Sequence, residues 1–318
     1  MKLLKQLFKI HSPSGNEKKM VRFIAWWIKS NVPGATIEID SIGNIYVMKG
    51  EAETYPCIVA HTDQVQRTHS KDFQAIETEN IILGFSKNKR QQEGLGADDK
   101  VGEWIALRCL KKFDTIKAAF FVQEEIGCRG SEKANMQFFD DCKYLIQCDR
   151  RNGNDLITNI GWTDLCSREF VQDLEAEKFG YKETQGAMTD VLQLKENGLK
   201  VSAINLSCGY YEPHTDHEFI MKAEVLNCLA FVEHIITNLT KTYPHIADDY
   251  GYLKGMDDTE FWAEEYDMAY DELEYIILNQ PAEVDENQIV EWYKGIYHFT
   301  EDELKSIIRD IKRINLMD

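Results

Sequence analysis

The sequence contains no long apolar run, no paired cysteines and no excess of basic residues, and each absence excludes a class of protein. No stretch approaches the roughly 18–20 apolar residues that a membrane-spanning helix needs. The eight cysteines form no C-x-x-C pair, which disfavours both a disulfide framework and zinc held by thiolates. The net charge is −18, whereas nucleic-acid binding needs basic faces. We therefore expect no membrane span, no nucleic-acid partner and free thiols.

Several familiar motifs are also missing. The chain has no Walker loop, no G-x-G-x-x-G, no G-x-S-x-G and no H-E-x-x-H, so the usual signatures of nucleotide binding, serine hydrolysis and single-zinc proteolysis do not apply. Residues 1–9 alternate basic and apolar side chains and then meet a polar stretch, which predicts a short amphipathic helix in place of a signal peptide. Together with the free thiols, this favours a cytoplasmic location.

Charge is distributed unevenly along the chain. Residues 246–318 contain 20 acids and 6 bases, so most of the negative charge lies in this last part. The 43% content of hydrophobic residues is enough for a substantial core. We expect a main domain over residues 1–245, a linker near 244–255, and an acidic, mostly helical C-terminal module over residues 246–318.

Short apolar runs alternate with helical patterns through the first 240 residues. This alternation predicts an α/β fold with a mixed, mostly parallel sheet and helices on both faces. The expected strands lie at 36–40, 44–48, 57–61, 118–122, 144–148 and 201–206, with a meander over 72–93. The expected helices lie at 16–31, 101–113, 130–138, 163–179 and 218–239, and in the C-terminal module at 258–278, 284–294 and 300–315.

Three of the expected strands end abruptly in acids or histidine. One runs into His61 and Asp63, a second into Glu124 and Glu125, and a third into Asp149. In an open parallel sheet, ligands bind outside the carboxyl ends of the strands. These side chains should therefore share one crevice, and their chemistry is that of a metal site.

Two further fragments extend this pattern. Asp98 and Asp99 follow a glycine-rich turn, and His214 lies in a turn before the last long helix. Each fragment alone has a structural explanation, such as a helix N-cap or a solvated turn. Together they supply imidazoles and carboxylates, which suit Zn²⁺, and two such ions can share a carboxylate. A cluster of carboxylates would also be electrostatically unfavourable without bound cations.

The chain here resembles the two-metal exopeptidases of clan MH, which include zinc aminopeptidases, peptidase T and related deacylases. The resemblance covers roughly residues 10–240 and rests on motifs that occur in the family's order: His61-Thr62-Asp63, Gly96-Ala97-Asp98-Asp99-Lys100-Val101-Gly102, Gln123-Glu124-Glu125-Ile126-Gly127-Cys128-Arg129-Gly130, Asp149 and Pro213-His214-Thr215.

The resemblance implies a ligand set for two divalent metal ions, most readily Zn²⁺, with Co²⁺ or Mn²⁺ as alternatives. By motif, His61 and Asp149 would hold one ion, Glu125 and His214 would hold the other, and Asp98 would bridge them.

Two further roles follow from the same motifs. Asp63 would orient His61, as metal-bound histidines generally require. Glu124 would be the general base that takes a proton from the attacking water. The implied fold is that of the zinc exopeptidases, and the implied substrate is a peptide or a small amide.

Many relatives insert a lid domain between these motifs. Here His61 and Asp98 are 37 positions apart and Asp149 and His214 are 65 apart, which leaves no room for a full lid. This similarity to the lidless branch favours an aminopeptidase, although the string from Gln123 to Gly130 is closer to a lid-bearing branch. A deacylase of N-acyl amino acids, a carboxypeptidase or dipeptidase, and a degenerate binding protein stay open as alternatives. A homo-oligomer also stays open. We interpret the acidic module as a small packed helical module with solvated acidic faces, and the alternative is that it caps the crevice in place of a lid or mediates assembly.

Overall fold

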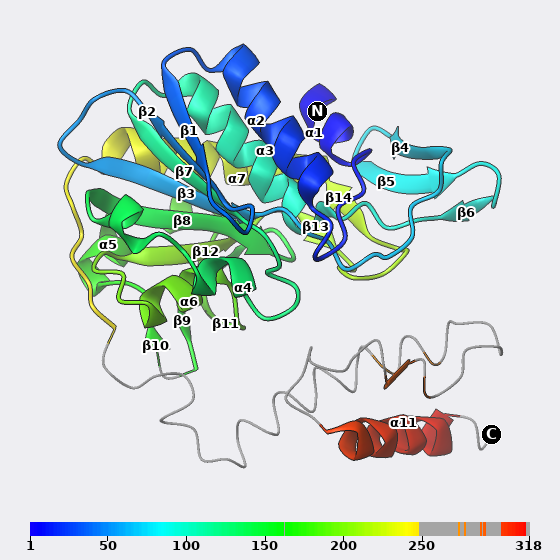
Figure 1. Cartoon of the computed structure of the whole chain (residues 1–318). Helices are drawn as coiled ribbons and strands as arrows, with labels where there is room; N and C mark the ends of the chain where they lie inside the picture. The colour runs from blue at the N-terminus through cyan, green and yellow to red at the C-terminus, as the bar shows by residue number, and fades with distance from the viewer. Residues whose placement is uncertain are drawn as a thin grey trace. The chain divides into compact units, whose positions relative to one another are not determined.

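The structure is a computed structural model and describes residues 1–161, 163–247, 273, 277, 287, 289, 290 and 300–315 (Figure 1). Contacts divide the chain into two compact units, Met1–Tyr252 and Leu253–Asp318. The boundary expected between residues 245 and 246 stays a prediction. Each unit is described by itself.

The first unit contains a nine-stranded mixed sheet, counted over the described residues. Its strand order is β1-β2-β7-β3-β8-β12-β9-β10, with β11 also paired to β9. The pairs β3–β7, β3–β8, β8–β12 and β9–β11 are parallel. The bounds are β1 Ala35–Ile39, β2 Ile45–Lys49, β3 Tyr55–His61, β7 Ile116–Phe121, β8 Cys142–Arg150, β9 Asp155–Ile160, β10 Thr163–Asp164, β11 Lys182–Gly186 and β12 Ala203–Ser207.

The helices cover both faces of this sheet (Figure 1). On one face α1 (Lys2–Leu7), α2 (Lys18–Asn31), α3 (Ala97–Lys112) and α7 (Lys222–Asn238) share a large apolar cluster with the sheet. On the other face α4 (Arg129–Glu132) and α6 (Asp190–Glu196) lie beside a smaller cluster. Strand β3 is buried along its whole length, which explains its uninterrupted apolar sequence. The α/β fold predicted from the sequence is confirmed.

A second, five-stranded sheet stands beside the first, again counted over the described residues. It has the order β13-β14-β5-β4, with β6 paired to β5. Its strands are β4 Phe73–Glu77, β5 Ile81–Ser86, β6 Gln91–Gln92, β13 Tyr210–Tyr211 and β14 Phe219–Met221. The predicted meander at 72–93 therefore pairs with a distant segment on either side of His214.

Several local predictions need correction. The helix expected over 163–179 is broken into β10, α5 (Arg168–Asp173) and the 3-10 turn η2 (Ala176–Phe179), because Ser167 caps a new helix by accepting the N–H of Phe170. The last long helix starts at Lys222, since the preceding residues join β14. Strands β9 and β11 were not expected at all.

The expected helix at 130–138 is likewise split, into α4 and the 3-10 turn η1 (Met136–Phe139). Pro244 does not begin a linker, because it forms a β-bridge with Val201. The neighbouring His245 N–H also donates to Lys200 O.

In the second unit the structure describes α11, Glu301–Asn315. Its buried side chains Leu304, Ile307, Ile308 and Ile311 recur at helical spacing, as the sequence predicts. The helices expected at 258–278 and 284–294 lie outside the described residues, apart from helical positions at 273, 277, 287, 289 and 290.

The eight cysteines are all buried and free, as predicted from the sequence. Among the described residues, no helix combines the length and the apolar character that crossing a membrane needs.

Candidate metal centre

Strand order brings the predicted acids and histidine together. Strands β7, β3 and β8 are parallel neighbours in the sheet, so their carboxyl ends meet at one edge. His61 is the last residue of the middle strand β3, and Asp149 lies near the end of β8. Glu124 and Glu125 follow the end of β7.

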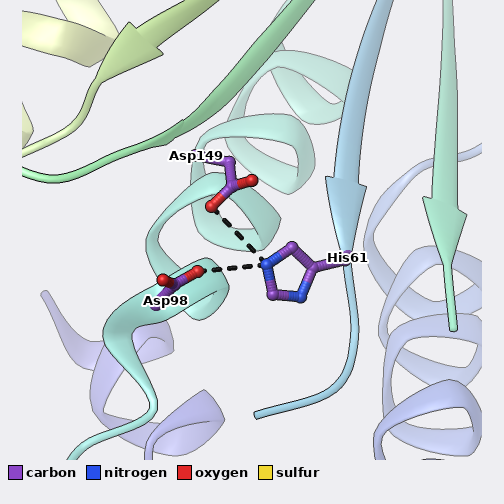
Figure 2. A group of neighbouring side chains, drawn as sticks. All are labelled: His61, Asp98 and Asp149. Atoms are coloured by element: carbon purple, nitrogen blue, oxygen red, sulfur yellow. Dashed lines mark hydrogen bonds and ion pairs between the residues drawn. The ribbon is translucent and has the colours of Figure 1, made fainter. Parts of the chain in front are cut away.

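A first group of candidate ligands lies around His61 (Figure 2). Its Nε2 lies 3.0 Å from Asp98 Oδ1 and 3.5 Å from Asp149 Oδ1. The three donor atoms all lie within 4.8 Å of one another, so one cation can contact all of them. The His61 side chain is only 1% exposed.

A second group forms around His214, in the loop between β13 and β14. Its Nε2 lies 3.1 Å from Glu125 Oε2 and 3.4 Å from Asp98 Oδ2. These donor atoms also lie within 4.8 Å of one another. Asp98 belongs to both groups and turns one carboxylate oxygen to each, which is the geometry of a bridging ligand.

Asp98 owes its position to an irregular start of helix α3. Gly96 has a left-handed backbone with φ of 60°, and a Cβ there would lie 2.8 Å from the Gln64 and Lys100 side chains. Asp98 and Asp99 depart from helical geometry. The buried Asp99 side chain accepts the N–H of His61 at 3.2 Å and the N–H of Gly102 at 3.0 Å. The turn thus fixes the backbone of His61 through the Asp99 carboxylate.

Asp63 connects His61 to the turn that carries the two glutamates. Its Oδ1 lies 3.5 Å from His61 Nδ1 and accepts the N–H of Glu124 at 2.9 Å. Its Oδ2 accepts the N–H of Glu125 at 3.2 Å and the hydroxyl of Ser14 at 2.7 Å. The Asp63 carboxylate therefore holds the backbone of both members of the Glu124–Glu125 pair, while its contact with His61 is the longest of the four.

Asp149 is held by the side chains of four other residues. Asn205 accepts the N–H of Asp149 at 2.9 Å and donates to its carbonyl oxygen at 2.8 Å. Thr189 Oγ1 and Gln147 Nε2 each donate to Oδ2 at 3.1 Å. Tyr210 donates to Oδ1 at 3.3 Å. Two of these contacts hold Oδ2, while Oδ1, which accepts from Tyr210, also lies 3.5 Å from His61 Nε2.

Glu218 fixes the backbone under the bridging aspartate. It is fully buried and accepts the N–H groups of Ala97 at 2.9 Å and Asp98 at 3.2 Å. Because Glu218 follows His214 by four residues, one loop supplies a candidate ligand and also the acceptor for the N–H of Asp98.

Glu124 points at the same centre. Its Oε2 lies 3.9 Å from His61 Nε2, and the Cys128 thiol lies 3.6 Å from its Oε1, with the sulfur as donor. The side chain is 11% exposed, so the carboxylate is largely but not completely shielded from solvent.

The electrostatics of the centre favour bound cations. Burial raises the pKa of Asp149 to about 8, and the charge of Asp98 adds to this. Burial and the charges of Asp149, Asp190 and Glu125 raise the pKa of Glu124. Burial would also raise the pKa of Asp98, but hydrogen bonds and charges from His214 and His61 outweigh it and lower that pKa. Cations between these carboxylates would reverse the mutual repulsion.

The donor set fits two divalent ions of borderline softness. Each group offers one imidazole nitrogen and two carboxylates, and the second group also contains Glu125 Oε1, a buried oxygen with no hydrogen-bond partner. A buried polar atom without a partner is unfavourable unless something binds it. A metal ion beside Glu125 would satisfy that atom.

All seven residues selected from the sequence lie together in the structure: His61, Asp63, Asp98, Glu124, Glu125, Asp149 and His214. Their individual roles stay predictions. The supporting residues Ser14, Thr189, Asn205 and Glu218 were missed. One signal was available for Asn205, since it is the polar residue in the middle of an apolar strand.

The chain matches no protein-family model. No curated protein is similar to it in sequence.

Solved structures do match. An aminopeptidase from the archaeon Desulfurococcus kamchatkensis aligns with a TM-score of 0.60 and 16% identity, over 76% of this chain and 95% of that one. Aminopeptidase PepT from Bacillus cereus aligns with a TM-score of 0.60 and 15% identity, over 76% and 98%. The Pyrococcus horikoshii TET1 peptidase aligns with a TM-score of 0.53 and 16% identity, over 73% and 98%. The chain therefore has the fold of the zinc exopeptidases that its motifs resemble.

Proposed function

We propose that this protein is a metal-dependent aminopeptidase, which hydrolyses the peptide bond next to a free N-terminus. The observation that carries the proposal is the Asp98 carboxylate. One of its oxygens lies 3.0 Å from His61 Nε2 and the other 3.4 Å from His214 Nε2, with a further carboxylate beside each histidine. Two ions sharing one carboxylate are typical of two-metal hydrolases.

The proposed cofactors are two divalent ions, with Zn²⁺ preferred and Co²⁺ or Mn²⁺ as alternatives, because imidazole and carboxylate donors suit all three. His61, Asp98 and Asp149 would hold one ion, and Asp98, Glu125 and His214 would hold the other. When bound, the pair would lower the pKa of a water molecule and polarise the substrate carbonyl.

The protein's own residues then move the proton. As the water oxygen attacks the carbonyl carbon, the Glu124 carboxylate accepts a proton from the water. The same carboxyl group then gives this proton to the nitrogen of the leaving amine. The C–N bond breaks, and the products are a free amino acid and a shortened peptide. Asp63 keeps the base in place by accepting its backbone N–H.

The direction of hydrolysis is supported by the structural neighbours, of which several are aminopeptidases by name. The proposed catalytic domain is residues 1–245, with residues 246–318 as an additional module. A homo-oligomer is part of the proposal, because the P. horikoshii TET1 peptidase assembles into a tetrahedron or an octahedral shell. A cytoplasmic location accords with eight free cysteines.

Metal content and hydrolysis should be measured on the same preparations of wild type, Asp98→Ala and Glu124→Gln. We expect about two zinc, cobalt or manganese ions per chain in the wild type. Asp98→Ala should lose metal and activity, whereas Glu124→Gln should keep the metal and lose activity. Metal without hydrolysis of any substrate would favour a degenerate binding protein and overturn the proposal.

A substrate panel decides between the related reactions. It should contain peptides with a free N-terminus, the same peptides N-acetylated, the same peptides amidated at the C-terminus, and N-acetyl amino acids. An aminopeptidase cleaves the free and amidated peptides and leaves the acetylated ones intact. Turnover of acetyl amino acids alone would identify a deacylase, and dependence on a free C-terminus would identify a carboxypeptidase.

A further inference from the structure

A separate open hollow, of about 1060 Å³, lies outside the metal centre. It is formed by the exposed side of α2, the segment after α1 and the segment that leads into β4. None of the seven candidate site residues lines it. The motifs that gave the proposed function therefore do not account for it.

The hollow gathers cations from three places in the sequence. Lys9 follows α1, Lys19 and Arg22 lie on α2, and Lys71 precedes β4. All four side chains are exposed, and none forms an ion pair within the part of the chain that the structure describes. In a chain with a net charge of −18, such a group of unpaired cations is a local reversal of charge.

The one acid among the lining residues is already engaged. Asp72 accepts the Ser86 hydroxyl at 3.1 Å and the N–H of Asn88 at 2.8 Å. Its hydrogen bonds, led by the one from the Asn88 backbone, lower its pKa. It is tied to the start of the next turn and does not pair with the four cations.

Aromatic side chains lie among the cations. Trp26 is 60% exposed, and its ring lies 5.8 Å from that of Phe23 on the same helix. His69 packs edge-on against Phe73, with 3.9 Å between ring centroids. An exposed tryptophan beside arginine and lysine provides apolar contact area together with positive charge.

We propose that this hollow is a docking groove for an acidic polypeptide segment that carries an aromatic or large apolar residue. Carboxylates of the segment pair with the cations of the groove, and its apolar residue packs on Trp26. Four cations on three separate segments match charges spaced along an extended chain better than one compact anion. A nucleic acid fits less well, because its binding needs a broad basic face, whereas the four cations form a small group on a chain with a net charge of −18.

The binding measurement does not depend on catalysis. The probe is a twelve-residue peptide of glutamate with two tyrosines, blocked at its N-terminus by fluorescein and amidated at its C-terminus. Fluorescence anisotropy is recorded on the full chain at low salt and at increasing NaCl. We expect saturable binding that weakens with salt, and at least about tenfold weaker binding for the double variant Lys19→Glu/Arg22→Glu.

A matched control carries the same change of charge elsewhere. Lys133 and Lys200 are exposed and have no ion pair among the described residues, so Lys133→Glu/Lys200→Glu should bind as the wild type does. Trp26→Ala should weaken binding with all charges kept. Equal losses in both double variants, equal binding of a glutamine version of the peptide, absence of binding, or tighter binding of single-stranded DNA would each overturn the proposal.

Discussion

The Glu218 carboxylate accepts a hydrogen bond from the backbone N–H of Asp98 across 3.2 Å, and a second bond from the preceding N–H reinforces it. A residue on the His214 loop thereby sets the position of the proposed bridging ligand. The Asp98 turn and the His214 loop lie far apart in the sequence and are joined by these two hydrogen bonds.

This contact predicts that Glu218→Ala lowers metal affinity. Without the acceptor, the backbone at Asp98 loses its fixed position, and loss of such outer contacts typically weakens metal binding by about 10–100-fold. The measurement is titration against a chelator of known affinity. Glu212→Ala is the control, because Glu212 is an exposed acid in the same loop. Unchanged affinity in Glu218→Ala would contradict the assigned role.

The hydroxyl of Thr189 offers a second test. Thr189→Val removes the donor to Asp149 Oδ2 and keeps the shape of the side chain. We expect the carboxylate to be held less firmly, with Gln147 as the remaining donor to Oδ2, and the metal affinity to fall by about tenfold. Thr158→Val is the control, since the Thr158 hydroxyl bonds to Glu183 away from the centre. A loss of the same size in the control would show a general effect on the fold.

The thiol of Cys128 should matter for the rate and not for the metal. Cys128→Ala removes the weak donor to Glu124 Oε1, so the proposed base is less well oriented. We expect kcat to fall several-fold with metal content and KM unchanged. Cys128→Ser, which restores a donor, should recover most of the rate. If serine behaves as alanine does, the thiol contributes packing alone.

Gly102 faces the buried Asp99 side chain at close range. A Cβ at this position would lie 2.3 Å from Asp99 Oδ1, so Gly102→Ala must displace the carboxylate that holds the His61 N–H. We expect a loss of about 1–3 kcal/mol in the free energy of unfolding, measured by urea denaturation. Lys111→Ala, an exposed change on the same helix, should leave stability nearly unaltered.

Glu103 should make stability depend on pH. Both its carboxylate oxygens are buried without a hydrogen-bond partner, and burial raises its pKa well above 4.5. The unfolded chain ionises above that pH while the folded chain stays protonated, so stability falls as pH rises from 4.5 toward the folded pKa. Glu103→Gln lacks this loss. Relative to wild type, the variant should gain at least about 1 kcal/mol between pH 4.5 and 7.5, in urea denaturation at each pH. Parallel pH curves would contradict this.

The pattern of apolar and polar residues predicts the alternation of strands and helices and the residues at the strand ends. Buried parallel strands are continuous apolar runs. The sequence therefore predicts β3, β7 and β8 and the acids at or after their ends. Prediction from the sequence was wrong where the helices and strands are short. The segment 163–179 has helical spacing, but pairing of Thr163 and Asp164 with β9 and the cap at Ser167 divide it.

The contacts that support the candidate ligands come from long-range packing. That Asn205 holds the backbone of Asp149 depends on β12 lying beside β8, and that Glu218 holds Asp98 depends on a loop returning across more than a hundred residues. Nothing local to either residue encodes such pairings. Likewise, the cations of the groove are scattered in the sequence, and the packing of α1, α2 and β4 brings them to one surface. Strand order and long-range packing are set by the burial of the whole apolar core. Because every segment contributes to that core, no single segment determines them.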